Sequence, residues 1–198
     1  GSIRPSLEKS IIDLWRVYGF LTVVMSATYI GLGMPVFDSI LHAFSAISTG
    51  GFSTGSASLA AFSSSIQIAT VLFMFLGGVN FVLLYRFLRA DYKPIFGNSE
   101  FRLYTLIFIL IGGWMTIDLL SGSSANAAVL NGFFQSAAVI SSTGYSTVSI
   151  MSVSLVLQVI VLAAMFVGGS LGSTSGGWKM FRLKTMIELL RTRLRAYN

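Results

Sequence analysis

Four long apolar segments constrain the fold of this chain more than any other feature of its sequence. They cover residues 17–34, 66–88, 103–120 and 151–169. At about 1.5 Å per helical residue, each segment spans or nearly spans a hydrocarbon core of about 30 Å. Because a backbone exposed to lipid must satisfy its own hydrogen bonds, each segment is expected to be a helix.

The composition indicates an all-α integral membrane protein. Of the 198 residues, 54% are hydrophobic and 10% are charged, whereas a soluble domain carries about 25% charged residues. The chain has no cysteine and one histidine, which excludes disulfides, thiolate metal sites and histidine clusters. Because the apolar segments contain no pair of carboxylates, we expect no enzyme active site.

The Lys and Arg residues fall into three clusters, separated by two long stretches without any, 17–85 and 103–178. The positive-inside rule places all three clusters in the cytoplasm, so loops 35–65 and 121–149 are expected outside. We therefore expect a multi-pass protein of the cell (inner) membrane with its N- and C-termini in the cytoplasm. The basic residues then face lipid headgroups or cytoplasm, and the net charge of +6 needs no nucleic acid partner.

Each outer loop contains a second, shorter apolar run, "FDSILHAFSAIS" (37–48) and "AAVLNGFFQSAAVIS" (127–141). These runs are too short to cross a bilayer. They are typical of re-entrant helices that enter the membrane and leave it on the same side.

A similar phrase ends each run, "AISTGGFST" (46–54) and "VISSTGYST" (139–147), offset by 93 residues. The repetition predicts two tandem channel-like units in the same orientation, residues 3–97 and 98–198. Each unit is expected to contain an outer helix, a short pore helix, an extended filter segment and an inner helix.

The repeated phrase suits a dehydrated cation, which needs oxygen ligands in place of its water. Backbone carbonyls supply such ligands in potassium channels, and glycines allow the backbone to turn its carbonyls toward an axis. The negative end of each short helix also favours a cation at this place. We expect K⁺ as the bound ion. The predicted filter residues are Ser48, Thr49, Gly50, Gly51, Ser141, Ser142, Thr143 and Gly144.

Two filter segments cannot surround an ion, because a full ring of carbonyls needs about four. Either a second copy of the chain pairs with the first in a homodimer, or the chain is half of a longer polypeptide with four units.

The fourth apolar segment runs into an unusual stretch, residues 168–177, in which nine of ten residues are Gly, Ser or Thr. Each internal glycine costs about 1 kcal/mol of helix stability relative to alanine, so the second inner helix is expected to be broken here. A flexible polar loop below the filter could close the pore. The predicted loop residues are Gly168, Gly169, Ser170, Gly172, Ser173, Thr174, Ser175, Gly176 and Gly177. Lys179 and Arg182 follow it, either at the inner mouth of the pore or facing headgroups.

These features resemble the TrkH/KtrB/TrkG superfamily of potassium transporters, in the second and third of that family's four units. The resemblance lies in "HAFSAISTGGFST" (42–54), "FFQSAAVISSTGYST" (133–147) and "VGGSLGSTSGGWKMFRLK" (167–184). It implies K⁺ transport, filter carbonyls at 48–51 and 141–144, a gating loop, and a cytoplasmic ring of nucleotide-binding regulatory subunits. The first and fourth units of the family are not represented.

Two alternatives to a K⁺ pathway follow from the residues. The filter phrase of potassium channels is TVGYG, and both filter phrases of this chain lack its second glycine. The first alternative is therefore a poorly selective Na⁺/K⁺ pathway. A non-conducting membrane subunit or scaffold is the other.

Overall fold

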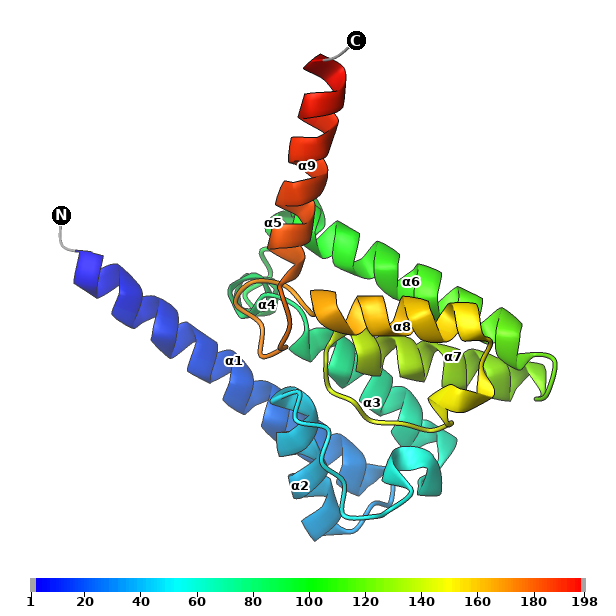
Figure 1. Ribbon diagram of the computed structural model, residues 1–198. Helices are drawn as coiled ribbons and strands as arrows, with labels where there is room; N and C mark the ends of the chain where they lie inside the picture. The colour runs from blue at the N-terminus through cyan, green and yellow to red at the C-terminus, as the bar shows by residue number, and fades with distance from the viewer. Residues whose placement is uncertain (1–2, 197–198) are drawn as a thin grey trace.

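The computed structural model describes the backbone of residues 3–196 and the side chains of residues 11–194. Within these residues the chain forms helices and no strand (Figure 1). The helices are α1 (Ile3–Gly31), α2 (Val36–Ile47), η1 (Ser58–Ala61), α3 (Ser64–Gly77), α4 (Phe81–Leu88), α5 (Lys93–Gly97), α6 (Ser99–Leu119), α7 (Ala125–Ile140), η2 (Ile150–Ser152), α8 (Leu155–Val167) and α9 (Met180–Ala196). The side chains of Arg4 and Lys9, in the first basic cluster, lie outside the described residues.

Short helix α7 lies at the centre of the fold. It packs along α6, and its other sides contact α3 and α8, so it joins the two halves of the chain (Figure 1). Its C-terminal half is almost wholly buried, including Phe134 and Ile140. In the first half, α2 packs on α1 in the corresponding way, and the Tyr29 hydroxyl lies 2.6 Å from Thr70 Oγ1 between α1 and α3.

Among the described residues, two helices are long and apolar enough to cross a membrane, residues 11–31 of α1 and all of α6. Helices α3 and α4 pass the same test as a pair, but the chain bends by 111° between them. The two short apolar runs at 37–48 and 127–141 form short helices, as expected, and these are α2 and α7.

The prediction of one continuous helix over residues 66–88 is therefore wrong, because the chain breaks between α3 and α4. Asn80 starts the new helix, and its side chain accepts hydrogen bonds from Val82 N and Leu83 N, a typical N-cap. Gly78 lies against the Tyr104 hydroxyl with no space for a Cβ. The first inner helix, as well as the second, is interrupted.

The fourth apolar segment is helical over a shorter range than the expected 151–169. Helix α8 begins after Ser154, whose backbone N–H donates to the Asp118 carboxylate at 2.9 Å, and it ends before Gly168. Its 13 residues are too few to span a bilayer alone. The chain then runs irregularly to α9, which projects from the body of the molecule (Figure 1).

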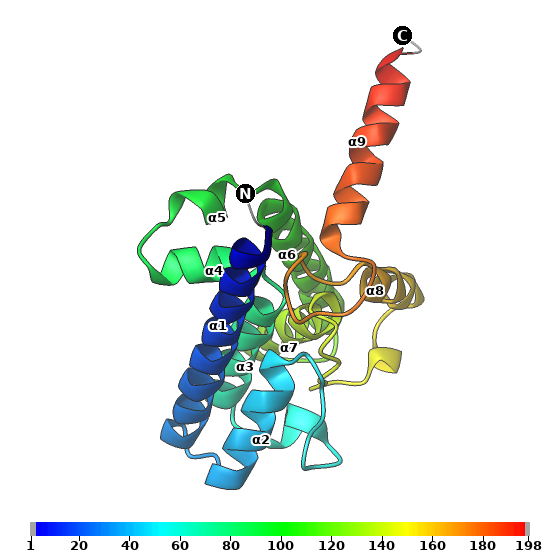
Figure 2. The same ribbon diagram turned by 90° about the vertical axis from the view of Figure 1, so that its left-hand side faces the viewer.

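Several helix ends and one connection lie toward the same end of the molecule. Figure 2 shows the start of α1, the α4–α5 connection and the start of α9 in its upper half. The turn between α1 and α2 lies at the opposite end (Figure 2).

Glycine permits the close approach of α6 and α7. A Cβ at Gly132 would lie 2.8 Å from Thr116 N and 2.9 Å from the Gly112 carbonyl, so these backbones would have to separate. We expect Gly132→Ala to cost about 1–3 kcal/mol, as overpacking does in other cores. Thermal unfolding in detergent should show a midpoint lowered by several degrees.

The matched control for that substitution is Gly113→Ala on α6, where an added Cβ meets nothing within 4 Å. It should leave the midpoint unchanged or raise it, since alanine favours a helix over glycine. Equal effects of the two substitutions would contradict the packing described here.

Candidate functional site

The two segments predicted as filter segments, residues 48–51 and 141–144, share a pattern of backbone conformations. Each begins with a serine that ends its pore helix in the right-handed helical conformation. The next residues, Thr49 and Ser142, both have positive φ angles (55° and 58°), and so do Gly51 and Gly144 (71° and 83°). Non-glycine residues rarely adopt positive φ, and here it recurs at equivalent positions of the two phrases, so the local backbone conformation repeats along with the phrase.

The two filter segments lie side by side. Gly51 rests directly on the Thr143 carbonyl, and any Cβ at residue 51 would collide with that oxygen. The Tyr145 hydroxyl donates to the Phe52 carbonyl at 3.0 Å. Tyr145 is buried (1% exposed), whereas the side chain of Phe52 is 82% exposed, although the two residues occupy equivalent positions.

Hydroxyl groups of the filter segments form hydrogen bonds within the protein. Ser141 Oγ donates to the Ala137 carbonyl at 2.6 Å and lies 2.7 Å from Thr143 Oγ1. Three residues of these segments, Ser48, Gly50 and Gly144, are exposed on the surface of the chain. No group of three or more His, Asp or Glu residues lies together within the described residues. Oxygen ligands for a cation at this site would therefore come mainly from the main chain.

Residues 168–177 form a loop that contacts both filter segments. Thr174 Oγ1 lies 2.6 Å from the Ile47 carbonyl and 3.0 Å from the Gly77 carbonyl. Thr49 Oγ1 lies 3.0 Å from the Thr174 carbonyl. On the second side, Ser175 Oγ lies 3.3 Å from Ser142 Oγ. The structure thus brings the predicted filter and loop residues into one site.

The neck of this loop is closed by backbone hydrogen bonds. Trp178 N donates to the Phe166 carbonyl at 2.9 Å, and Met180 N donates to the Gly169 carbonyl at 3.0 Å. At the neck Gly168 lies against the Gly176 carbonyl with no space for a Cβ. These bonds satisfy backbone groups that the interrupted helix leaves without partners.

The same loop rests on the break between α3 and α4. Ser170 N donates to the Gly78 carbonyl at 2.8 Å, and Phe81 N donates to the Gly172 carbonyl at 3.0 Å. The loop at 168–177, which the sequence predicted, therefore packs against the α3–α4 break, which the sequence did not predict. The break could have been predicted from Gly77 and Gly78, which weaken a helix, and from Asn80, which favours the start of a new one.

Charged side chains lie on both flanks of the loop. Lys179 Nζ donates to the Ser175 carbonyl, while Arg182 lines a separate, open cavity of about 650 Å³ beside Phe166. Burial lowers the pKa of Lys179 from its ordinary value, and the nearby Glu100 carboxylate opposes that shift. Glu100 also accepts a hydrogen bond from the loop, at Leu171 N. The sequence did not predict this contact.

The chain matches, over residues 1–198, the family model described as TrkH, cation transport protein. The chain belongs to the TrkH family. Its members are ion transporters, in agreement with the expectation that the chain is not an enzyme.

Individual TrkH-family relatives support the same assignment. The Trk system potassium uptake protein TrkH of Salmonella typhimurium is 33% identical over 191 residues, which cover 94% of this chain and 40% of that protein. TrkG of Escherichia coli is 30% identical over 190 residues, or 94% of this chain and 39% of that protein. The chain thus spans about 40% of the length of the curated relatives it matches.

The fold is also that of a solved family member. The crystal structure of the potassium transporter TrkH from Vibrio parahaemolyticus matches with a TM-score of 0.90 and 31% identity. The match covers 96% of this chain and 42% of that one. The chain therefore folds as one part of a TrkH protein does.

Gly51 provides a test of the contact between the filter segments. Gly51→Ala combines a positive φ with a collision against backbone, so we expect destabilisation of about 1–3 kcal/mol and a lowered midpoint of thermal unfolding. Gly55→Ala is the matched control in the same loop, because an added Cβ there meets nothing within 4 Å. An unchanged midpoint for Gly51→Ala would show that the two segments are not in contact.

Proposed function

We propose that the chain forms part of a pore that conducts K⁺, with residues 48–51 and 141–144 as two of its selectivity-filter segments. The observation that carries the proposal is the pair of segments with the same unusual φ angles, packed against each other at the C-terminal ends of the two short helices α2 and α7. The relatives are named as potassium uptake proteins, which supports K⁺ as the ion.

In this proposal each filter segment offers main-chain carbonyl oxygens to an ion that has lost its water. The C-terminal ends of α2 and α7 reach the segments at Ser48 and Ser141, and the negative ends of their helix dipoles favour a cation there. The non-helical backbone is permitted at membrane depth because it is buried in protein or lines a cavity.

The other filter segments of the ring come from outside this sequence. We propose that further repeats of a longer chain supply them, since the relatives are more than twice as long as the matched region. The exposed Phe52 supports a missing neighbour, because its counterpart Tyr145 is buried against the first repeat. The other arrangement is a homodimer, in which a second copy supplies two more segments.

The loop at 168–177 is proposed as the gate. It is bonded to the first filter segment through the Thr174 carbonyl and Thr49 Oγ1, and to the second through Ser175 and Ser142. An ion leaving the filter inward would therefore meet it. Lys179 and Arg182 follow at the inner mouth, where positive charge would repel cations until the loop moves.

The orientation follows from the charges. We propose cytoplasmic N- and C-termini in the inner membrane. The basic clusters support this orientation, and so do the starts of α1 and α9, which lie toward the same end of the molecule (Figure 2). The cytoplasmic ends would then receive a ring of nucleotide-binding regulatory subunits, as the family resemblance implies.

Ion flux into liposomes tests the proposal. The complete pore, meaning the chain with whatever repeats or second copy complete it, should take up Rb⁺, and external K⁺ should compete better than Na⁺. Gly51→Val together with Gly144→Val should lower the flux roughly tenfold or more, since each introduces backbone strain in the filter.

Gly55→Val is the control, because it lies in the same loop with free space around it. Equal competition by Na⁺ and K⁺ would indicate the poorly selective pathway. Selective flux that persists in the double variant would contradict the filter assignment, and absence of flux from the folded, complete pore would favour a scaffold.

A further inference from the structure

Glu100 is a buried carboxylate that neither the filter nor the membrane topology requires. It lies in the first turn of α6 and is 8% exposed. Its Oε1 accepts a hydrogen bond from Leu171 N, in the 168–177 loop, at 2.7 Å. Burying a charge is costly unless it is paired and hydrogen-bonded, and this bond links an outer helix directly to the loop.

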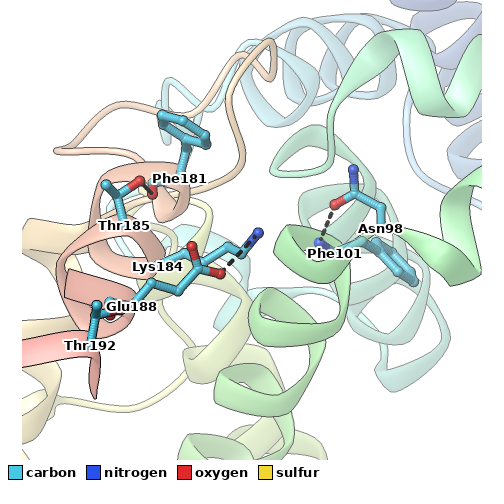
Figure 3. A network of polar contacts seen from close by, with 7 residues as sticks. All are labelled: Asn98, Phe101, Phe181, Lys184, Thr185, Glu188 and Thr192. Carbon is cyan, nitrogen blue, oxygen red and sulfur yellow. Dashed lines mark hydrogen bonds and ion pairs between the residues drawn. The ribbon is translucent and has the colours of Figure 1, made fainter. Parts of the chain in front are cut away.

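The first turn of α6 is held rigidly in place. Asn98 caps it by accepting from Phe101 N at 2.9 Å (Figure 3). The start of α9 lies beside it, and the Lys184 side chain extends from α9 on the side that faces α6 (Figure 3). Glu100 and the residues that follow the loop therefore lie at the starts of two neighbouring helices, α6 and α9.

Lys179 holds the opposite flank of the loop. Its ammonium group donates to the Ser175 carbonyl, and its φ of 68° is strained for a residue with a side chain. Among the described residues, Glu100 and Lys179 are the charged side chains that hydrogen-bond to the loop. Hydrogen bonds to charged groups are about twice as strong as those between neutral ones.

We propose that Glu100 and Lys179 are positioning residues that clamp the 168–177 loop in its closed position, one at Leu171 and the other at Ser175. This inference rests on the proposed role of the loop as a gate. The clamp sets how often the loop opens when no regulatory subunit acts on it. Loss of either hydrogen bond, at Leu171 or at Ser175, allows the loop to move away while the filter segments keep their conformation.

A thiol placed in the loop can report its opening. This sequence has no cysteine, and Ser170 is 2% exposed with no hydrogen-bond partner for its Oγ, so Ser170→Cys is a nearly isosteric change. Any cysteine outside this sequence is first replaced. Labelling by a water-soluble maleimide and Rb⁺ flux are then measured on the complete pore in liposomes without regulatory subunits.

Glu100→Leu should raise both the labelling rate and the basal flux about tenfold or more, as expected for losing a hydrogen bond to a charged group. Glu100→Gln keeps an acceptor for Leu171 N but loses the charge, so both quantities should lie between those of the parent and those of Glu100→Leu. Lys179→Met should raise both quantities as well, and it tests the clamp even if Glu100→Leu fails to fold. Asp91→Asn is the control, because that carboxylate pairs with Arg86 and does not contact the loop.

An unchanged labelling rate in folded Glu100→Leu and Lys179→Met would overturn the clamp, even if selective flux proves the filter assignment right. Faster labelling with unchanged flux would overturn the clamp's part in gating, because the loop would then open without controlling conduction. Faster labelling in Asp91→Asn as well would also overturn it, since the effect would not be specific to the loop contacts.

Discussion

Backbone hydrogen bonding is the constraint on which this fold depends. At membrane depth a peptide group that leaves a helix must find a partner in protein or in a water-filled cavity. The chain leaves its helices repeatedly, after α2, α3, α7 and α8, and the resulting irregular segments satisfy one another. The loop at 168–177 bonds to the α3–α4 break and to both filter segments, so these irregular parts form one cluster.

This mutual bonding links the proposed conduction and gating. The carbonyls of Ile47 and Gly77 accept from the loop through Thr174, so a movement of the loop exposes backbone groups that must find new partners. In a pore, water and ions provide those partners. In the proposed gate, opening would exchange protein hydrogen bonds for solvent, and the charged contacts at Glu100 and Lys179 would bias that exchange toward the closed loop.

Much of this arrangement was predictable because it depends on local sequence. The apolar lengths locate α1 and α6, and the repeated phrase locates α2, α7 and the segments after them. The glycine-rich stretch predicted the irregular loop, because glycines weaken a helix wherever it lies. The basic clusters also predicted that the start of α1 and the start of α9 share one end of the molecule.

The remainder depends on contacts between distant residues, which one sequence does not show. Residues 66–88 are apolar enough for a continuous helix, yet the chain breaks where Gly78 meets Tyr104 and the loop. Glu100 looks like an ordinary charge at the start of a helix until Leu171 is seen to bond to it. The different surroundings of Phe52 and Tyr145 likewise appear only when the repeats are placed together.

The central claim is that the main-chain oxygens of the two filter segments bind a dehydrated cation. Anomalous diffraction from crystals of the complete pore grown in Rb⁺ or Tl⁺ tests it most directly. The account predicts peaks on the pore axis beside the carbonyls of residues 48–51 and 141–144, weakened by added K⁺. Ordered ions found only elsewhere, with none beside these segments, would contradict it.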